Sequence, residues 1–347
     1  MEKESFYKKR IQPLIRHKVF SLVILLIVMV VIFSIWSSAT GGQFLKPSTL
    51  ANILSAIVLS AFLAIGSGCL LIGGNLDLSA AAVGALGGMV LASAIVNWGW
   101  PTIIAILFSL VVCGLLGAFN ALMVTKFRFP AFIATFAMFS MARAIMYLFS
   151  SIGVENGTAN NIAIYYNDMM DFLGKSTIAK IPAGNDVIAV PVGVAVVLVF
   201  FVFYGILISK SKFGLKMMML GGNPTAASLA GINSTKITYI LFINGSVLGG
   251  IAGVFSTARL GQGSLLALQT NQYTGITAAI LGGISFGGGA GGMGGVLVGL
   301  LVLMTFQIGM GTVGFNPFWV NVLSGVILLI ALSLDFIAQQ RAAKVEL

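Results

Sequence analysis

Histidine and cysteine are almost missing from this sequence of 347 residues, which holds one histidine and two cysteines. Cys69 and Cys113 lie in separate apolar runs and are typical of small buried hydrophobic residues rather than of a disulfide. His17 sits in a basic segment. No Ser-His-acid or Cys-His arrangement can therefore form, and no His/Cys cluster is present to hold a metal. We predict that the chain is not an enzyme and has no metal site.

Charged residues are also scarce, at 8% of the sequence, against roughly a quarter in an ordinary soluble domain. Hydrophobic residues make up 58%, too many to hide in one soluble core. The 25 phenylalanines exclude a disordered chain, and the glycines follow no triplet that would indicate collagen. The net charge of +10 does not indicate a nucleic-acid partner, because the basic residues gather at the ends of apolar runs. The composition predicts an all-α polytopic membrane protein that contacts the lipid bilayer.

A helix needs about 20 mostly apolar residues to cross the hydrocarbon layer. Ten stretches are candidates: 19–37, 49–72, 80–97, 102–125, 130–151, 188–209, 237–258, 274–286, 296–313 and 318–338. No small-residue cleavage site follows the first, so we interpret it as a retained span. The eighth is short and broken by glycine, which indicates a half-helix. Such breaks are tolerated where the backbone is buried in protein or lines a cavity.

The lysines and arginines predict the orientation. Fourteen of them lie on the side of the leader 1–18, and four lie on the opposite side. Since cytoplasmic loops carry the excess of basic residues, we expect both termini in the cytoplasm. The predicted organisation is a basic cytoplasmic leader over 1–18, a membrane domain over 19–338 and a cytoplasmic tail over 339–347.

Two long polar segments interrupt the membrane domain. Residues 152–187 should form an extracytoplasmic loop or cap. Residues 210–236 face the cytoplasm in this topology and contain Asn223 followed by Pro224. A capping asparagine before proline at the first helical position predicts a short helix within the loop. Such a helix is a docking element more often than a mere connector, although the pattern alone leaves both open.

Glycine-rich turns occur twice in similar settings. One apolar helix runs into the segment 73–79, and a later one runs into the segment 282–289. Transporters often duplicate such broken-helix units around a central site. Two further glycine series indicate close helix packing: Gly245, Gly249 and Gly253, and Gly291, Gly295 and Gly299.

Three charged residues fall inside or at the start of predicted spans, and Asp335, near the cytoplasmic end of the last, needs no special role. Asp77 is either a helix cap, which we favour because a cap needs no partner, or a hydrogen-bonding group for a polar solute. Arg143 should be paired or face water, and Asp77 is a candidate partner. The phenylalanines before Arg143, including Phe136, are interpreted as packing rather than as a platform for stacking a sugar. A G-x-G-x-x-G match at 287–292 lacks the strand–helix unit of a nucleotide site.

Four stretches follow one another between residues 49 and 338: Gly74–Ser79, Pro130–Thr135 with Arg143 after it, Gly214 with Gly221–Ile232, and Ala278–Ser285. Together they resemble the permease subunits of bacterial sugar importers of the ATP-binding-cassette type. This is the ribose-permease family, within a superfamily that includes permeases for branched-chain amino acids. The sequence departs from the family pattern at Asn75, which stands in place of a glycine, and at Gln272–Thr274, which lacks two acids of the relatives.

The resemblance implies a subunit of the bacterial cytoplasmic membrane. It would work with a second permease, identical or different, with separate ATPase subunits and with an extracytoplasmic solute-binding protein. This chain would bind no cofactor, and the partner ATPase would use ATP and magnesium. The implied solute is a pentose or hexose. The alternatives are a nucleoside, an autoinducer or a branched-chain amino acid, and a more distant rival is an ion-coupled secondary transporter.

The resemblance also implies site residues. The candidates for coupling to the ATPase, on a helix that would dock in it, are Gly214, Gly221, Gly222, Asn223, Ala226, Ala227 and Gly231. The candidates for the substrate pathway are Asn75, Asp77, Ser79, Phe136, Arg143, Gln272 and Ser285.

Overall fold

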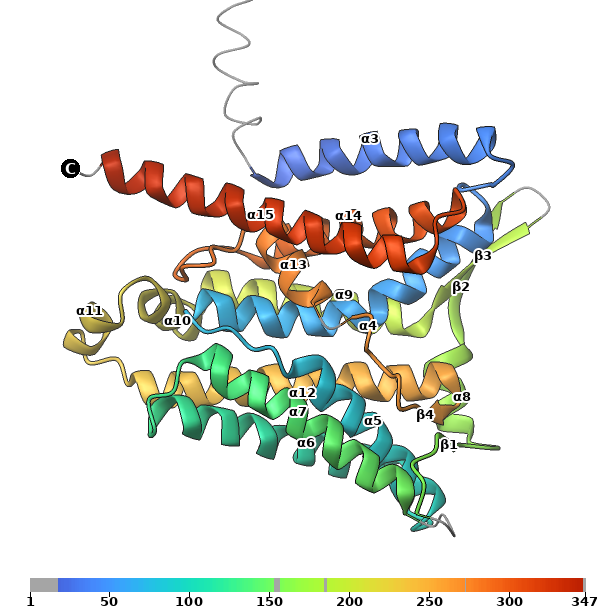
Figure 1. Cartoon of the computed structure of the whole chain (residues 1–347), viewed down its shortest axis with the longest axis horizontal. Helices are drawn as coiled ribbons and strands as arrows, with labels where there is room; N and C mark the ends of the chain where they lie inside the picture. Colours follow the sequence, from blue (N-terminus) through green and yellow to red (C-terminus); the bar gives the residue numbers. More distant parts are fainter. Residues whose placement is uncertain (1–17, 153–156, 184–185, 272, 346–347) are drawn as a thin grey trace, which may run out of the picture.

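Long helices running in a common direction dominate the computed structural model (Figure 1), which describes residues 18–152, 157–183, 186–271 and 273–345. The first half contains α3 (Lys18–Ala39), α4 (Pro47–Ile72), α5 (Ala80–Val96), α6 (Thr102–Thr125), α7 (Ala131–Ser151), β1 (Ile162–Ala163), α8 (Asp168–Lys175), β2 (Thr177–Ala183) and β3 (Asp186–Pro191). The second half contains α9 (Val192–Lys210), α10 (Lys212–Gly222), α11 (Pro224–Leu229), α12 (Ser234–Leu260), β4 (Gln262–Gly263), α13 (Thr274–Leu281), α14 (Met293–Thr312) and α15 (Pro317–Val345).

Within the described residues, seven helices are long and apolar enough to cross a membrane: α3, α4, α6, α7, α9, α12 and α14. Two shorter apolar stretches, Ala80–Val96 and Pro317–Ser333, accompany them. The predicted span 274–286 is a helix of only eight residues, α13, which ends where Gly282 and Gly283 follow. The full number of ten crossings stays a prediction.

The sixth predicted span, 188–209, begins too early in the sequence-based assignment. Residues 186–191 form β3, which pairs antiparallel with β2, and the helix α9 starts only at Val192. The reason is local, because Pro191 has no backbone N–H for a helix interior and β-branched residues such as Val187 and Ile188 favour a strand.

The two ends of the molecule carry different elements (Figure 1). α10 and α11 lie at one end, together with the end of α15, whereas α8 and the β2–β3 hairpin lie at the opposite end. Near α8, β1 pairs with β4, which joins the segment after α7 to the segment after α12. The described parts of the segments 152–187 and 210–236 thus lie at opposite ends of the molecule.

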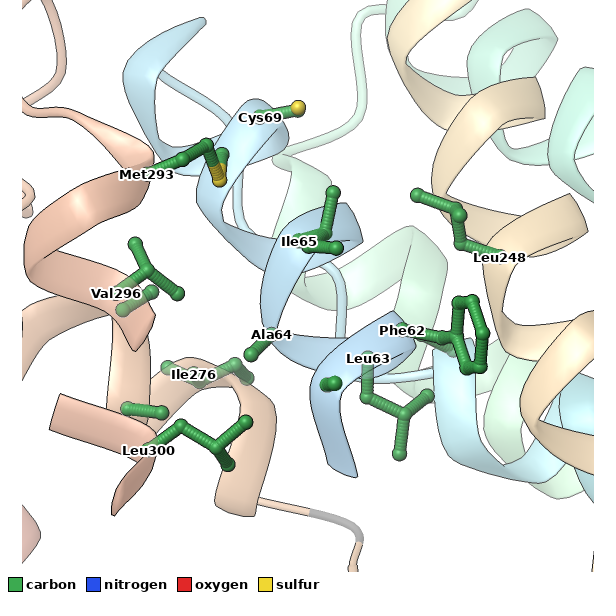
Figure 2. Packing of buried hydrophobic residues seen from close by; sticks show 14 of the residues in the cluster. Phe62, Leu63, Ala64, Ile65, Cys69, Leu248, Ile276, Met293, Val296 and Leu300 are labelled. Carbon is green, nitrogen blue, oxygen red and sulfur yellow. The ribbon is translucent and has the colours of Figure 1, made fainter. Parts of the chain in front are cut away.

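α4 lies at the centre of the bundle. In its most apolar stretch 78% of the residues are buried, against 11% in α3, so α4 is surrounded by protein whereas α3 presents its sides to the surroundings. Figure 2 shows Phe62 of α4 beside Leu248 of α12, while Ile276 of α13 and Val296 and Leu300 of α14 lie on the other side of α4. α4 therefore holds α12 and the α13–α14 pair in place.

Bare backbone contacts bring α5 and α12 together, as the glycine series predicted. A Cβ added to Gly84 would lie 2.2 Å from the carbonyl oxygen of Gly249, and one added to Gly253 would lie 1.9 Å from the carbonyl oxygen of Gly84. Because lipid chains are as apolar as side chains, helices associate in membranes through such close packing. On α14, Gly295 and Gly299 pack in the same way against the carbonyl oxygens of Gly282 and Ala278.

The substitution Gly253→Ala should lower the stability of the protein by about 1–3 kcal/mol, because its methyl group has to push α5 away from α12. Gly205→Ala on α9 is the control, since its Cβ would meet only the Cβ of Met293, at 4.0 Å. Thermal unfolding of the two detergent-solubilised variants measures the difference. Equal melting temperatures would contradict the packing described here.

Candidate functional site

Two adjoining pockets, of about 360 and 550 Å³, lie on either side of the segment before α13. They share Gln269 and Tyr273, and we call the two together the polar groove. The first is lined by Phe139, Arg143, Tyr147, Leu265, Leu266, Gln269 and Tyr273. The second is lined by Gln269, Thr270, Tyr273, Thr274, Thr277, Leu303, Gln307, Asn321, Ser324, Gly325 and Leu328. Their volumes fall within the roughly 300–1,000 Å³ typical of small-molecule sites.

The segment between α12 and α13 forms the wall that the two pockets share. The helix α12 ends at Gly261, whose left-handed backbone (φ 65°) suits glycine. The amide of Asn271 donates to Ser60 of α4 over 2.8 Å, and Asn161 accepts from the backbone N–H of Leu265 over 2.9 Å. The chain is therefore held in a non-helical path beside α4, which places Gln269 and Tyr273 in the groove.

The hydrogen-bonding side chains of the groove are mostly neutral. Among the described lining residues, Arg143 is the only charged one. Its guanidinium donates to the carbonyl oxygen of Leu265 over 3.1 Å and lies 5.9 Å from the ring centroid of Phe139. Gln307 donates to Ser324 over 3.3 Å. Amides and hydroxyls both donate and accept, so the groove can exchange hydrogen bonds with an uncharged polar solute.

The sequence-predicted pathway residues do not come together in one place. Arg143 lines the groove. Phe136 lies outside the two pockets, exposed on α7 and stacked on Phe139 at a centroid distance of 6.3 Å. Ser285 belongs to the turn after α13, and Gln272 lies outside the described residues. Asn75, Asp77 and Ser79 are in the turn between α4 and α5, away from both pockets.

Asp77 and Arg143 do not form the pair that the sequence suggested. One oxygen of Asp77, Oδ1, accepts from the backbone N–H and the hydroxyl of Ser79, each over 2.6 Å. Ser79 Oγ in turn accepts from the amide of Asn120 of α6 over 3.0 Å. Asp77 is only 3% exposed. The carboxylate thus closes the turn just before α5, a structural role that does not involve Arg143.

The residues at the start of α11 follow the capping prediction closely. The side chain of Asn223 accepts from the backbone N–H of Ala226 over 2.9 Å, and Pro224 is the first residue of α11. Gly231 (φ 77°) ends the turn after α11, where a left-handed residue is required. The predicted short helix is confirmed.

The candidate coupling residues divide into two groups. Gly222, Asn223, Ala226 and Gly231 are exposed, whereas Gly214, Gly221 and Ala227 are buried. Leu229 at the end of α11 is 86% exposed. The exposed group and Leu229 belong to α11 and the residues on either side of it, and α11 lies at one end of the molecule (Figure 1).

Known proteins identify this architecture. A family model described as the permease component of branched-chain amino acid transport systems matches residues 49–332. The chain belongs to this family. It is a multi-pass permease of the inner membrane, a transport component rather than an enzyme.

Three of the relatives have names that describe them as permeases for sugars. The permease is 30% identical to the xylose transport system permease protein of Haemophilus influenzae, over 90% of this chain and 95% of that one. It is 29% identical to the ribose import permease protein of Bacillus subtilis, over 89% of this chain and 90% of that one. It is 28% identical to the fructose import permease protein of Rhizobium meliloti, over 89% of this chain and 84% of that one.

Several groove residues of the permease were missed by sequence reasoning, above all Gln307 of α14 and Asn321 and Ser324 of α15. A signal for them exists, because amide side chains inside apolar spans are uncommon and usually face protein or water. The sequence does not show that two separate helices turn these residues toward Gln269.

Replacing Asp77 by alanine should lower the melting temperature of the permease, at a cost of about 1–2 kcal/mol, because Ser79 loses the acceptor of its N–H and hydroxyl. Asp77→Asn keeps one acceptor oxygen and should be closer to the wild type. Thermal unfolding and uptake per folded complex separate the roles of this residue. Normal stability of Asp77→Ala together with lost uptake would exclude a structural role in this turn and favour a place in the pathway.

Proposed function

We propose that the permease is the transmembrane subunit of an ATP-binding-cassette importer and that it carries a monosaccharide, a pentose or a hexose, through the polar groove. The observation that carries this proposal is the lining of the groove. It combines amides, hydroxyls and the aromatic ring of Tyr273 without a carboxylate among the described residues. Membership of the family and the sugar-named relatives support it.

A sugar fits this lining for chemical reasons. Each of its hydroxyls donates and accepts hydrogen bonds, which matches Gln269, Thr270 and Asn321. In the part of the chain that the structure describes, the side chains of Gln269 and Asn321 make no hydrogen bond of their own and are available to a solute. Few charges line the groove, so it holds the solute weakly and lets it pass, while a solute-binding protein supplies the affinity.

Among the alternative solutes, a branched-chain amino acid fits the groove less well than a sugar, whereas a nucleoside or an autoinducer fits it equally well. A branched-chain amino acid carries an ammonium group that needs a carboxylate partner when it leaves water, and the described lining residues contain none. A nucleoside or an autoinducer remains an alternative. An ion-coupled carrier would need a coupling carboxylate in the pathway, but Asp77 is bound to Ser79 and lies outside the groove.

The substitution Gln269→Met should reduce sugar uptake about fivefold, because it keeps the size of the side chain and removes about 1 kcal/mol of hydrogen bonding to the solute. Gln262→Met on β4 is the matched control, since Gln262 does not line the groove. Uptake of labelled xylose, ribose and fructose is measured in proteoliposomes that contain the complete importer with ATP inside.

Two outcomes of that experiment would contradict the proposal. One is equal uptake by Gln269→Met and Gln262→Met. The other is a wild-type importer that takes up leucine but none of the three sugars.

The direction of transport would come from an ATPase subunit that docks on α11, so that ATP and magnesium act in the partner rather than in this chain. Leu229 supports this placement, because its large apolar side chain at the end of α11 is exposed and free to contact a partner. The loop 210–236 carries the exposed residues Lys210, Lys216 and Lys236, which fits its assignment to the cytoplasmic side.

The proposal places further partners by the same topology. A second permease subunit, identical or different, would cover the open side of the polar groove, where Tyr273 and Leu266 are exposed. An extracytoplasmic binding protein would contact the end with α8 and the β2–β3 hairpin, opposite α11 (Figure 1).

The substitution Leu229→Ser should weaken binding of the ATPase about tenfold, since truncating a central apolar contact of an interface typically costs more than about 1 kcal/mol. Leu45→Ser is the control, because Leu45 is also exposed but lies between α3 and α4. Co-purification of the ATPase with the tagged chain gives the measurement. Unchanged recovery of the ATPase with Leu229→Ser would exclude α11 as the docking element.

A further inference from the structure

Three segments that are far apart in the sequence meet through bare backbone beside α11. They are the end of α4 with the turn 73–79, the end of α10, and the turn 282–292 between α13 and α14. A Cβ added to Gly221 would lie 1.9 Å from the carbonyl oxygen of Ile72 and 2.7 Å from the backbone nitrogen of Gly289. Gly74 and Gly288 approach Gly221 from the other two segments.

The contacts are mutual and include a hydrogen bond. A Cβ on Gly288 would lie 2.7 Å from the carbonyl oxygen of Gly221 and 3.0 Å from the Cα of Gly74. The backbone N–H of Gly289 donates to the carbonyl oxygen of Ile72 over 2.8 Å. Gly74, Gly288 and Gly289 have φ values of 75°, 85° and 76°, which favour glycine. We call Gly74, Gly221, Gly288 and Gly289 the glycine junction.

The glycine junction lies between the docking helix and the polar groove. On one side, only Gly222 and Asn223 separate Gly221 from the start of α11, and Asn223 is the cap of that helix. On the other side, the turn 282–292 directly follows α13, and Thr274 and Thr277 of α13 line the groove.

The helices beyond the junction are also tightly joined. A Cβ on Gly295 of α14 would lie 1.9 Å from the carbonyl oxygen of Gly282, so the end of α13 cannot shift without α14. At the same time α4 carries Ser60, which holds Asn271 in the wall of the groove.

We propose that the glycine junction transmits the movement of α11 to both broken-helix units of the permease at once, with Gly221 as its central positioning residue. This inference rests on the proposed function, because it takes α11 as the element that the ATPase moves. Backbones in direct contact leave no flexible side chain to absorb a displacement, so a shift of α10 displaces the turns 73–79 and 282–292 together.

This arrangement gives the glycines a role beyond packing. The two glycine-rich turns, which look like an internal echo in the sequence, contact the same residue of α10. A single motion of the docking helix therefore reaches α5 through the first turn and α13 with α14 through the second. The second pocket of the groove lies against α13, α14 and α15, so this part of the lining moves with the second unit.

The variant Gly221→Ala tests the inference in the complete importer. Its methyl group overlaps the carbonyl oxygen of Ile72 and separates α10 from both turns. We expect the ATPase still to co-purify, while the amount of sugar taken up per ATP hydrolysed falls at least tenfold. Gly294→Ala on α14 is the control, because no atom lies within 4 Å of its added Cβ. Gly221→Ala with the transport stoichiometry of the control would overturn the inference.

A second experiment decides the matter if Gly221→Ala fails to assemble. The double variant Met218→Cys and Ala290→Cys places one thiol on α10 and one on the turn after α13. The two positions are close, because Ala290 follows Gly289, and a Cβ added to Gly289 would lie 3.3 Å from the carbonyl oxygen of Met218. The native Cys69 and Cys113 are buried. If the junction moves as one body, joining the two thiols with a short bifunctional reagent leaves sugar uptake intact. Loss of uptake on joining, restored with a cleavable reagent after cleavage, would show that the segments slide and would overturn the inference.

Failure of the proposed function has a different signature. A wild-type chain that neither co-purifies with an ATPase nor takes up sugar would refute the importer itself. A working wild-type importer, in which Gly221→Ala behaves like Gly294→Ala, would refute only the junction.

Discussion

Close approach of helix backbones is the constraint on which the rest of this structure depends. In lipid, helices gain little from burying apolar side chains and associate through packing. Here glycine carries the tightest contacts, as where Gly84 meets Gly249 and Gly253, and where Gly221 meets Ile72. The same contacts fix α5 against α12 and α13 against α14, and α5 and α13 in turn contact α7 and α15, which carry Arg143 and Asn321 of the polar groove.

The polar groove offers a polar solute hydrogen-bonding partners with very little charge. Buried charges are costly in a membrane, and amides and hydroxyls offer hydrogen bonds at a smaller cost of desolvation. The non-helical segment before α13 supplies several of these groups, and it is tolerated because Ser60 and Asn161 satisfy part of its backbone and side chains. Weak contacts with little charge suit the proposed pathway, in which a partner ATPase would impose the direction through α11.

The sequence predicted those parts of the fold whose conformation depends mainly on residues adjacent in the chain. Asn223 and Pro224 indicated α11, the apolar runs indicated the long helices, and Gly282 with Gly283 indicated the short α13. Residues 188–191 were assigned to a membrane span but belong to β3, although the β-branched residues around the dipeptide Gly184-Asn185 are a strand signal. Contacts between distant segments were not predictable, since Gln307, Asn321 and Gln269 meet only after the helices pack. The supposed pair of Asp77 and Arg143 was wrong for this reason, because Ser79 and Leu265 lie nearer.

The most direct test of this account is native mass spectrometry of the tagged chain, purified from its own membrane in a mild detergent. We predict an assembly that contains two permease subunits, this chain twice or this chain with a second permease, and two ATPase subunits. A folded chain that remains alone at every detergent concentration, and still catalyses uptake driven by an ion gradient, would contradict the importer and make Asp77 the first residue to re-examine.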